Sequence, residues 1–270
     1  MIEQFIAAEL SEAFDGKDLF AAVCALEGET YRELESRRTI RTRILDDWYF
    51  AKIHFGSGWG EIFKNLLQAR LPVLGAGNEW RALNRLAEVG VPSMVPVLYY
   101  RERHWLNPAS ECSAILTRSL EDKVSLEDFV PASPVIRRRL IQKVASMARD
   151  MHRGGVNHRD FYLCHFLMDR GSDADPVLHL IDLHRAQVRD RVPDRWLIKD
   201  LGGLLFSAFD KALTRRDLLR FLRHYRDASL REMSPNEKNF WRAVRRRAIR
   251  LYLQDHQDLP PELSRLLTWP

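Results

Sequence analysis

The sequence predicts an α+β fold with a small lobe of antiparallel strands over residues 1–117 and a larger, mainly helical lobe over residues 118–270. Apolar and polar residues alternate between residues 39 and 55, which indicates paired strands because successive side chains of a strand point to opposite faces. From residue 133 onward, apolar residues recur at helical spacing. With 270 residues, 46% of them hydrophobic, the chain can bury a sizeable core.

Composition indicates a cytoplasmic protein with anionic partners. The formal net charge of +5 suits a nucleotide, a nucleic acid, a phosphorylated glycolipid or an anionic membrane. A nucleic-acid partner is not expected, because aromatic platforms for bases are missing. The cysteines, Cys24, Cys112 and Cys164, are scattered, so we expect no disulfide framework. The N-terminus lacks a signal-peptide pattern, and the apolar stretch 201–209 is too short to span a bilayer, so the protein is expected to be soluble or peripheral on a membrane.

The small lobe begins with short elements. The segment up to Phe14 is either an amphipathic helix or a loose arm. Asp18 is a suitable N-cap for a helix that runs to Leu26 and stops before Gly28. Residues 39–44 and 48–55 then form an antiparallel pair, with Asp46-Asp47 as the turn between them.

A lysine in the second of these strands is a candidate for binding a ligand. Lys52 lies among apolar neighbours, although most strand lysines only solubilise an exposed face. Glu79 starts a helix that ends at Gly90 before a proline, and it is the natural partner of Lys52. Residues 61–70 between them predict an additional packing helix.

Two further positions of the small lobe are candidates for nucleotide binding. Arg37 and Arg38 are expected in the turn between the first two strands, where a glycine-rich phosphate loop is missing. Their guanidinium groups suit phosphate oxygens, although a solvated charged turn is an equal alternative. Residues 95–100 and 114–117 predict the last two strands, and Thr117 leads into a hinge whose backbone would pair with an adenine ring.

The large lobe opens with a strongly predicted helix. Ser133 is the expected N-cap, Pro134 occupies the first helical position, and the helix runs past Met151 to Gly154-Gly155. Residues 137–139 are all arginines, which is unfavourable at the positive end of a helix and predicts an anionic ligand or nearby acids.

Three more helices are expected over residues 193–209, 214–225 and 235–254. The first carries Asp200 among apolar residues, and a carboxylate in such a place needs hydrogen-bond donors. The last starts with a capping box at Ser234 and places Arg242, Arg246 and Arg250 on one face. That face is either simply solvated or docks on an anionic membrane surface or an acidic protein.

Residues 158–184 contain the candidate catalytic groups. Asp160 follows the helix, His165 comes five positions later, and Asp182 closes an apolar strand. Phosphoryl transfer needs one carboxylate near the attacking alcohol and oxygen ligands for magnesium, since the protein mainly positions the nucleophile and neutralises phosphate charge. A His-Arg-Asp triplet alone could be a polar loop. The helix before it and the Asp-terminated strand after it are typical of protein-kinase-like phosphotransferases.

The same residues carry a family resemblance. Asn157-His158-Arg159-Asp160, Cys164-His165-Phe166 and residues 181–187 resemble the lipopolysaccharide core heptose(I) kinases of the WaaP/RfaP type. Residues 32–39, 64–67, 71–76 and 79–80 agree, so the resemblance covers about residues 16–225.

The resemblance implies a protein-kinase-like bilobal fold and transfer of phosphate from ATP, with magnesium, to O4 of the first heptose of the lipopolysaccharide inner core. Carried over to this sequence, Asp160 is the catalytic base, Asp182 a metal ligand, and Lys52 with Glu79 the pair that anchors the nucleotide. Asp200 resembles the kinase aspartate that accepts hydrogen bonds from the catalytic loop. The resemblance also suggests acyl carrier protein as a partner and the cytoplasmic face of the inner membrane as the location.

Departures from protein kinases leave alternatives. His165 replaces the usual Asn metal ligand, and it either contacts the metal or orients Asp160 or a metal-bound water. Leu183-His184 replaces Phe-Gly, and no Ala-Pro-Glu segment follows. A zinc site from His158, Cys164 and His165 lacks the usual ligand spacing. A protein kinase and a catalytically inactive kinase-fold binding module are the alternative functions.

Overall fold

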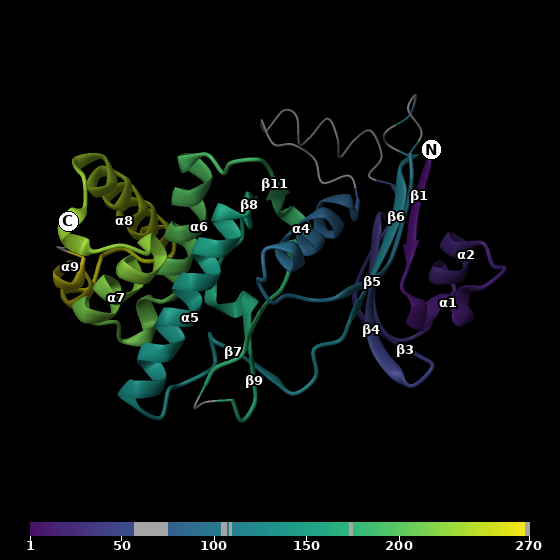
Figure 1. The fold of residues 1–270 in the computed structure, drawn as a ribbon, viewed down its shortest axis with the longest axis horizontal. Coiled ribbons are helices and arrows are strands. Elements are labelled where there is room, and N and C mark those ends of the chain that lie inside the picture. The colour runs from purple at the N-terminus through teal and green to yellow at the C-terminus, as the bar shows by residue number, and fades with distance from the viewer. Residues whose placement is uncertain (57–74, 104–106, 108–109, 173–174, 268–270) are drawn as a thin grey trace. The chain divides into compact units, whose positions relative to one another are not determined.

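The computed structural model describes residues 1–56, 75–103, 107, 110–172 and 175–267. The chain divides into two compact units whose elements are labelled in Figure 1. The first unit comprises Met1–Asn84, Met94–Glu121 and Leu183–Arg185, and the second comprises Arg85–Ser93, Asp122–Asp182 and Ala186–Pro270. The helix expected over residues 61–70 lies outside the described residues.

A six-stranded antiparallel sheet, in the order β1-β5-β6-β4-β3-β2, forms the first unit. The strands are β1 (Ile2–Ile6), β2 (Glu29–Leu34), β3 (Arg37–Ile44), β4 (Asp47–His54), β5 (Pro96–Glu102) and β6 (Cys112–Arg118). Helices α1 (Ala8–Phe14) and α2 (Leu19–Cys24) bury their apolar residues against Ile40, Ala51 and Ile53 of this sheet. Asp18 caps α2 as expected, because its side chain accepts from the N–H of Ala21.

The β3–β4 hairpin is confirmed, and the structure corrects three details of this unit. The turn lies at Leu45–Asp46, where Leu45 has φ of 54°, so Asp47 already belongs to β4. The first residues form the strand β1, which pairs with β5, and only then a helix. Arg37 and Arg38 lie in β3, not in the turn, because the turn after β2 needs only Glu35 and Ser36.

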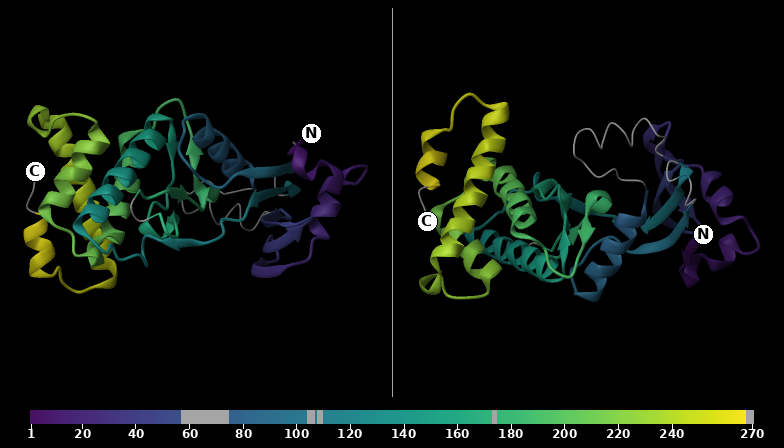
Figure 2. Two further views of the ribbon diagram at one scale, coloured as in Figure 1. Left: turned by 60° about the horizontal axis from the view of Figure 1, so that its bottom comes forward. Right: turned by 90° about the horizontal axis from the view of Figure 1, so that it is seen from above.

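The second unit is mainly helical (Figure 2). Its helices are α5 (Pro134–Arg153), α6 (Asp194–Ser207), α7 (Arg215–Arg226), α8 (Pro235–Asp255) and α9 (Pro261–Leu266), and its strands are β7 (Lys123–Ser125), β8 (Val156–Asn157), β9 (Phe166–Asp169), β10 (Leu178–Leu180) and β11 (Gln187–Val188). Helix α5 packs against α7, and α6 packs against α8. Ser133 and Ser234 cap α5 and α8 as predicted. Every helix in the part of the chain that the structure describes is too short or too polar to cross a bilayer.

The first arginine at the start of α5, Arg137, finds an acid within the fold. Arg137 donates through Nε to the Asp217 carboxylate at 3.0 Å and through Nη2 to the carbonyls of Lys211 and Ala212 at 2.9 Å. Of the two explanations predicted from sequence, nearby acids account for Arg137. The pair joins α5 to the N-terminus of α7, where a carboxylate also favours the helix dipole.

A buried carboxylate of α6 fixes the loop after β8. Asp200 is fully buried, and its two oxygens accept the backbone N–H groups of His158 at 2.7 Å and Arg159 at 2.8 Å. Gly203 lets α6 approach this loop closely, since a Cβ there would lie 3.1 Å from the carbonyl oxygen of Phe161. The hydrogen bonding predicted for Asp200 is therefore confirmed.

The substitution Asp200→Asn tests this anchor. Asn keeps the shape but directs an NH₂ group at a backbone N–H, so one buried donor loses its acceptor, and we expect the free energy of unfolding to fall by about 1–3 kcal/mol. Urea denaturation at neutral pH measures it. Asp194→Asn, on an exposed residue of the same helix, is the matched control and should cost less than about 1 kcal/mol. Equal effects of the two substitutions would show that Asp200 does not anchor the loop.

Candidate active site

The first unit contains a buried ion pair. Lys52 of β4 places Nζ 2.6 Å from Oε1 of Glu79, which lies in α4 (Gly77–Glu88). Their side chains are only 12% and 1% exposed, so water screens the pair little. The pairing predicted from the sequence is confirmed. The carboxylate of Glu79 holds the ammonium group of Lys52 in one place, which is a suitable arrangement for binding phosphate oxygens.

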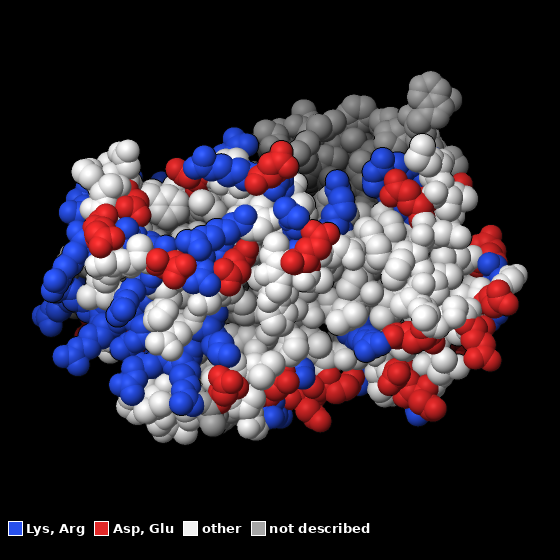
Figure 3. All heavy atoms as spheres, viewed as in Figure 1, with Lys and Arg blue, Asp and Glu red and all other residues white. Residues whose placement is uncertain are grey.

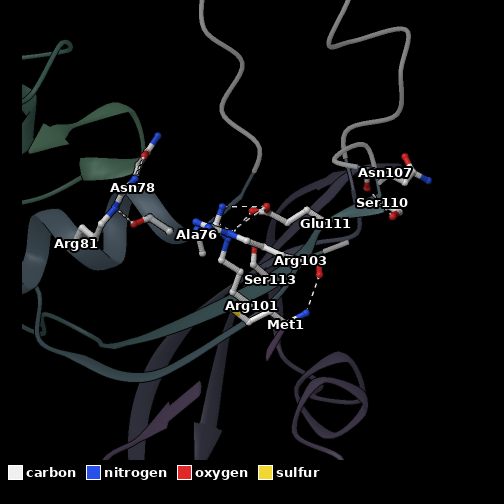
Figure 4. A network of polar contacts seen from close by, with 11 residues as sticks. Met1, Ala76, Asn78, Arg81, Arg101, Arg103, Asn107, Ser110, Glu111 and Ser113 are labelled. Carbon is white, nitrogen blue, oxygen red and sulfur yellow. Dashed lines mark hydrogen bonds and ion pairs between the residues drawn. The ribbon is translucent and has the colours of Figure 1, made fainter. Parts of the chain in front are cut away.

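A polar network fixes the N-terminal end of α4 (Figure 4). The N–H of Ala76 donates to Oγ of Ser113 at 3.0 Å. Beside it, Arg101 binds both oxygens of Glu111, at 2.7 and 2.9 Å. The Trp80 ring stacks on Tyr99 with a centroid distance of 4.7 Å. These contacts set the first turn of α4, and therefore the position from which Glu79 reaches Lys52.

The other expected nucleotide residues are less accessible than the sequence indicated. Arg38 donates to the carbonyl of Cys24 at 3.2 Å, so its guanidinium already has a backbone acceptor. Arg37 pairs in register with His54. Thr117 is 1% exposed and lies in the inner strand β6, paired with Phe50 of β4 and Pro96 of β5. These three nucleotide-binding assignments stay predictions.

His54 adds no positive charge beside Lys52. Burial is the main reason that its pKa falls to about 3, and the charges of Arg37 and Lys52 lower it further. The imidazole is therefore neutral near pH 7. Below pH 6 it would have to be protonated on unfolding, so it reduces stability as the pH falls from about 6.5 towards 3.

In the second unit, two loops are cross-linked through backbone and histidine groups. His158 is fully buried and donates through Nε2 to the carbonyl of Ile181 at 2.9 Å. Burial lowers the pKa of His158, so the ring donates as a neutral imidazole. The N–H of Ile181 in turn donates to the carbonyl of His165 at 3.0 Å. The loop that carries Asp160 is thus held against the residue before Asp182.

Both loops contain a strained backbone position. Arg159, directly before Asp160, has φ of 76°, and Asp182 has φ of 62°. A residue with a Cβ pays roughly 1–2 kcal/mol in this left-handed region. Such strain persists where surrounding contacts over-determine the conformation, and it is concentrated at functional sites.

His165 lies between the two aspartates. Its Nδ1 is 2.6 Å from the carbonyl oxygen of Asp160, and its Nε2 is 3.6 Å from Oδ2 of Asp182. Because a carbonyl oxygen only accepts, Nδ1 carries the proton and donates. The ring thus bonds to the loop of Asp160 through Nδ1 and places Nε2 beside the Asp182 carboxylate.

These donors fit a magnesium site better than a zinc site. Magnesium takes one or two carboxylates together with substrate phosphates and water, and Asp182 can supply that carboxylate. No group of three or more His, Cys, Asp or Glu side chains suited to a metal occurs within the described residues, so the zinc alternative with Cys164 has no support there. Burial also raises the pKa of the Cys164 thiol, which opposes the thiolate that zinc needs.

Sequence reasoning missed several residues around these loops. Arg189 donates to the side-chain oxygens of Asn157 and Gln187. Gly155, with φ of 81°, lets the backbone of Arg189 come close, since a Cβ would lie 1.8 Å from the carbonyl oxygen of Arg189. Ser113 was also missed. Only the glycines at residues 75, 77 and 155 gave a signal, because glycine often marks close backbone approach.

Comparison with known proteins adds independent evidence. The sequence model of the lipopolysaccharide kinase (Kdo/WaaP) family matches residues 21–225. The chain is 51% identical to the lipopolysaccharide core heptose(I) kinase WaaP of Pseudomonas aeruginosa over 248 residues, which cover 88% of this chain and 92% of that protein. It is 43% identical to WaaP of Escherichia coli over 256 residues, covering 90% and 96%.

A solved structure of similar sequence has the same fold. The structure described as WaaP in complex with acyl carrier protein is 42% identical, with a TM-score of 0.80, and covers 93% of this chain and 99% of the solved chain. The α+β fold, with its small antiparallel sheet and helical second unit, is therefore the protein-kinase-like fold predicted from the sequence. By its sequence and its fold, the chain belongs to the lipopolysaccharide kinase (Kdo/WaaP) family.

Proposed function

We propose that this chain is a lipopolysaccharide core heptose(I) kinase, which transfers the γ-phosphoryl group of ATP to O4 of the first heptose with the help of magnesium. The observation that carries the proposal is the position of His165, bonded to the Asp160 carbonyl and facing the Asp182 carboxylate. It joins a candidate base and a candidate metal ligand in one rigid arrangement. The names of the relatives supply the substrate class.

The side chains account for the steps of such a transfer. The sugar hydroxyl attacks the γ-phosphorus, the bond from that phosphorus to the ADP oxygen breaks, and the hydroxyl proton passes to the Asp160 carboxylate. Lys52, held by Glu79, balances charge on the nucleotide phosphates. Asp182 would hold magnesium, with His165 contacting the ion or a water on it, and the ion would neutralise phosphate charge.

The proposal places the enzyme in the cytoplasm, where ATP is available, at the inner face of the membrane that presents its acceptor. The deciding experiment is incubation with ATP, magnesium and purified core lipopolysaccharide that lacks heptose phosphate, followed by mass spectrometry and NMR of the product. One added phosphoryl group, located on O4 of the first heptose, is expected. Phosphorylated peptide in place of saccharide would favour a protein kinase, and no transfer at all would favour a kinase-fold binding module.

A second function, docking of acyl carrier protein, is favoured by the charge of the second unit. Arg242, Arg246 and Arg250 are exposed on α8, and Figure 3 shows Lys and Arg gathered on the part of the molecule where α7 and α8 lie. An acidic carrier protein would complement this surface.

The same unit contains an apolar cavity of about 380 Å³, lined by Leu140, Val144, Leu204, Leu222 and Trp241 among others. A cavity of this size and lining suits a hydrocarbon chain such as the carrier delivers.

Asp160→Asn is expected to lower kcat at least about a hundredfold, because general-base catalysis typically contributes 10²- to 10⁴-fold. Asn keeps the shape of the side chain but cannot take up the hydroxyl proton. ATP binding and the melting temperature should stay near those of the parent protein. Steady-state kinetics with core lipopolysaccharide measures the effect, and near-normal turnover would contradict the assignment of this loop.

The magnesium dependence of the rate separates the roles of His165 and Asp182. His165→Ala should raise the magnesium concentration at half-maximal rate by about 10- to 100-fold, which is typical for the loss of a group that orients a metal ligand. Asp182→Asn should raise it as well and also weaken nucleotide binding, whereas Asp160→Asn should leave the midpoint unchanged. If His165→Ala only lowers thermal stability, the residue has a structural role.

Reversing Arg242, Arg246 and Arg250 to Glu should weaken binding of purified acyl carrier protein at least about tenfold at low salt, because screened surface charges still steer and hold an acidic partner. Reversal of Lys17, Arg32 and Arg43, three exposed cations of the first unit, is the matched control. Calorimetry measures both. Binding to anionic lipid vesicles is measured with the same variants. If the reversal weakens only vesicle binding, the arginine surface of α8 docks on the membrane. If binding to both the carrier protein and the vesicles is unchanged and insensitive to salt, this surface has no docking role.

A further inference from the structure

Three polar side chains form a chain of contacts that ends at the catalytic loop. The hydroxyl of Tyr225, in α7, lies 2.9 Å from Nδ1 of His152, in α5. On the other side of the imidazole, Nε2 of His152 lies 3.5 Å from Oδ2 of Asp200, in α6. Asp200 in turn accepts the backbone N–H groups of His158 and Arg159. Three helices are thus linked, through one imidazole, to the loop that carries the candidate base.

The chemistry of the three groups sets the direction of these contacts. Burial raises the pKa of Tyr225, so its hydroxyl keeps its proton near neutral pH. A neutral His152 ring that accepts this hydroxyl at Nδ1 carries its own proton on Nε2, which faces the Asp200 carboxylate. Without the hydroxyl, Nδ1 could take the proton instead, and the donor facing Asp200 would be lost. Tyr225 therefore selects the tautomer of His152.

The contact between His152 and Asp200 is the adjustable member of this chain. His152 is 6% exposed, and its Nε2 makes no hydrogen bond within the described residues. An N–H···O bond normally spans about 2.9 Å, so the observed 3.5 Å exceeds it by roughly 0.6 Å. A buried donor without an acceptor lowers stability, so a small approach that closes this distance is favourable. Asp200 would then be fixed by a third donor in addition to the two backbone groups.

The same three helices line the apolar cavity of about 380 Å³. Phe221 of α7 and Trp241 of α8 are two of its walls, and both contact the ring of Tyr225, with centroid distances of 6.0 and 5.5 Å. Leu201 of α6 is a third wall. Val130, which is 79% exposed, also lines the cavity, so the cavity extends to the surface and a ligand can enter from solvent.

An apolar occupant of this cavity would restrict the side chains that hold Tyr225. Atoms that line a cavity lack partners on one side, and an occupant supplies the missing dispersion contacts. When Phe221 and Trp241 are fixed in this way, the ring of Tyr225 loses freedom, and its hydroxyl holds the His152 imidazole in one orientation. Coupling of this kind is measured as a change in order, and it requires no large displacement.

We infer that filling of the apolar cavity by a hydrocarbon chain regulates the catalytic loop, with Tyr225 and His152 as the positioning residues that connect the two sites. The inference rests on the proposed function, to which it adds the regulation of the same active site. Both residues act through Asp200, which holds the loop by two backbone N–H groups. A kinase controlled in this way phosphorylates its acceptor fastest when a hydrocarbon chain occupies the cavity.

Amide hydrogen exchange tests the coupling without using kinase activity. Dodecanoate is the probe of the cavity, and calorimetry measures its binding. In the parent protein, bound dodecanoate should slow exchange of the His158 and Arg159 amides at least about fivefold, the lower end of typical coupling between two sites. Tyr225→Phe keeps the ring on Phe221 and Trp241, so it should bind the probe within about twofold of the parent, but the exchange of the two amides should no longer respond.

Further variants separate this coupling from a general loss of stability. Tyr252→Phe removes the hydroxyl of another buried tyrosine of the second unit and should keep the full response, so it is the matched control. His152→Gln keeps a donor that can face Asp200 and should preserve part of the response, whereas His152→Leu should abolish it. A response that persists in Tyr225→Phe, or that disappears equally in Tyr252→Phe, would overturn the inference. Probe binding without slower exchange in the parent protein would overturn it too, as would absence of probe binding.

Kinetics provides the second readout. Tyr225→Phe should lower kcat about fivefold, with the KM values for ATP and core lipopolysaccharide within about twofold of the parent, because the variant changes the orientation of the loop and not the contacts that bind either substrate. Dodecanoate should raise kcat of the parent protein and leave that of Tyr225→Phe unchanged. Raised KM values with an unchanged kcat would contradict the inference. Slower amide exchange with bound probe, but no phosphate transfer, would refute the proposed function alone.

Discussion

The carboxylate of Asp200 accepts the N–H groups of two successive residues, His158 and Arg159, and the arrangement of the second unit depends on this interaction. A carboxylate buried inside a helical core is stable only when donors surround it, and here the backbone of the catalytic loop supplies them. The left-handed φ of Arg159 is held by the same bonds. From this anchor, His158 reaches Ile181, and His165 reaches both aspartates.

The two units are each pre-organised by their own contacts. In the first, Ser113 and the Arg101–Glu111 pair fix the start of α4, so Glu79 reaches Lys52 without help from a ligand. In the second, the loops of Asp160 and Asp182 are bonded to each other before any substrate arrives. Pre-organised charges lower the reorganisation that accompanies phosphoryl transfer, which is the largest contribution a protein can make to this reaction.

Sequence reasoning succeeded where a local pattern determines the structure. The caps at Asp18, Ser133 and Ser234 and the β3–β4 alternation depend on neighbouring residues, and each was confirmed. Lys52 with Glu79 and the donors around Asp200 could be predicted because the family resemblance supplied the distant partner. The strand β1 was missed because its pairing with β5 joins residues about a hundred positions apart.

The remaining contacts have no local signature. The ion pair of Arg137 with Asp217, and the bonds from Arg189 to Asn157, arise only when helices and loops pack together. Arg37 and Arg38 were placed in a turn because charge is common in turns, whereas the tight turn ended earlier and left them in β3. Tyr225, His152 and Asp200 come from three different helices, so only the fold reveals them as a group.

Amide hydrogen exchange of the parent protein tests the Asp200 anchor most directly. If Asp200 holds the loop, the amides of His158 and Arg159 exchange slowly, with protection comparable to that of the buried helix α5, although they lie in an irregular segment. Two-dimensional NMR resolves the two positions. Exchange of both amides as fast as that of the exposed residue Asp190 would contradict the account, because the loop that presents Asp160 would then be held by something other than Asp200.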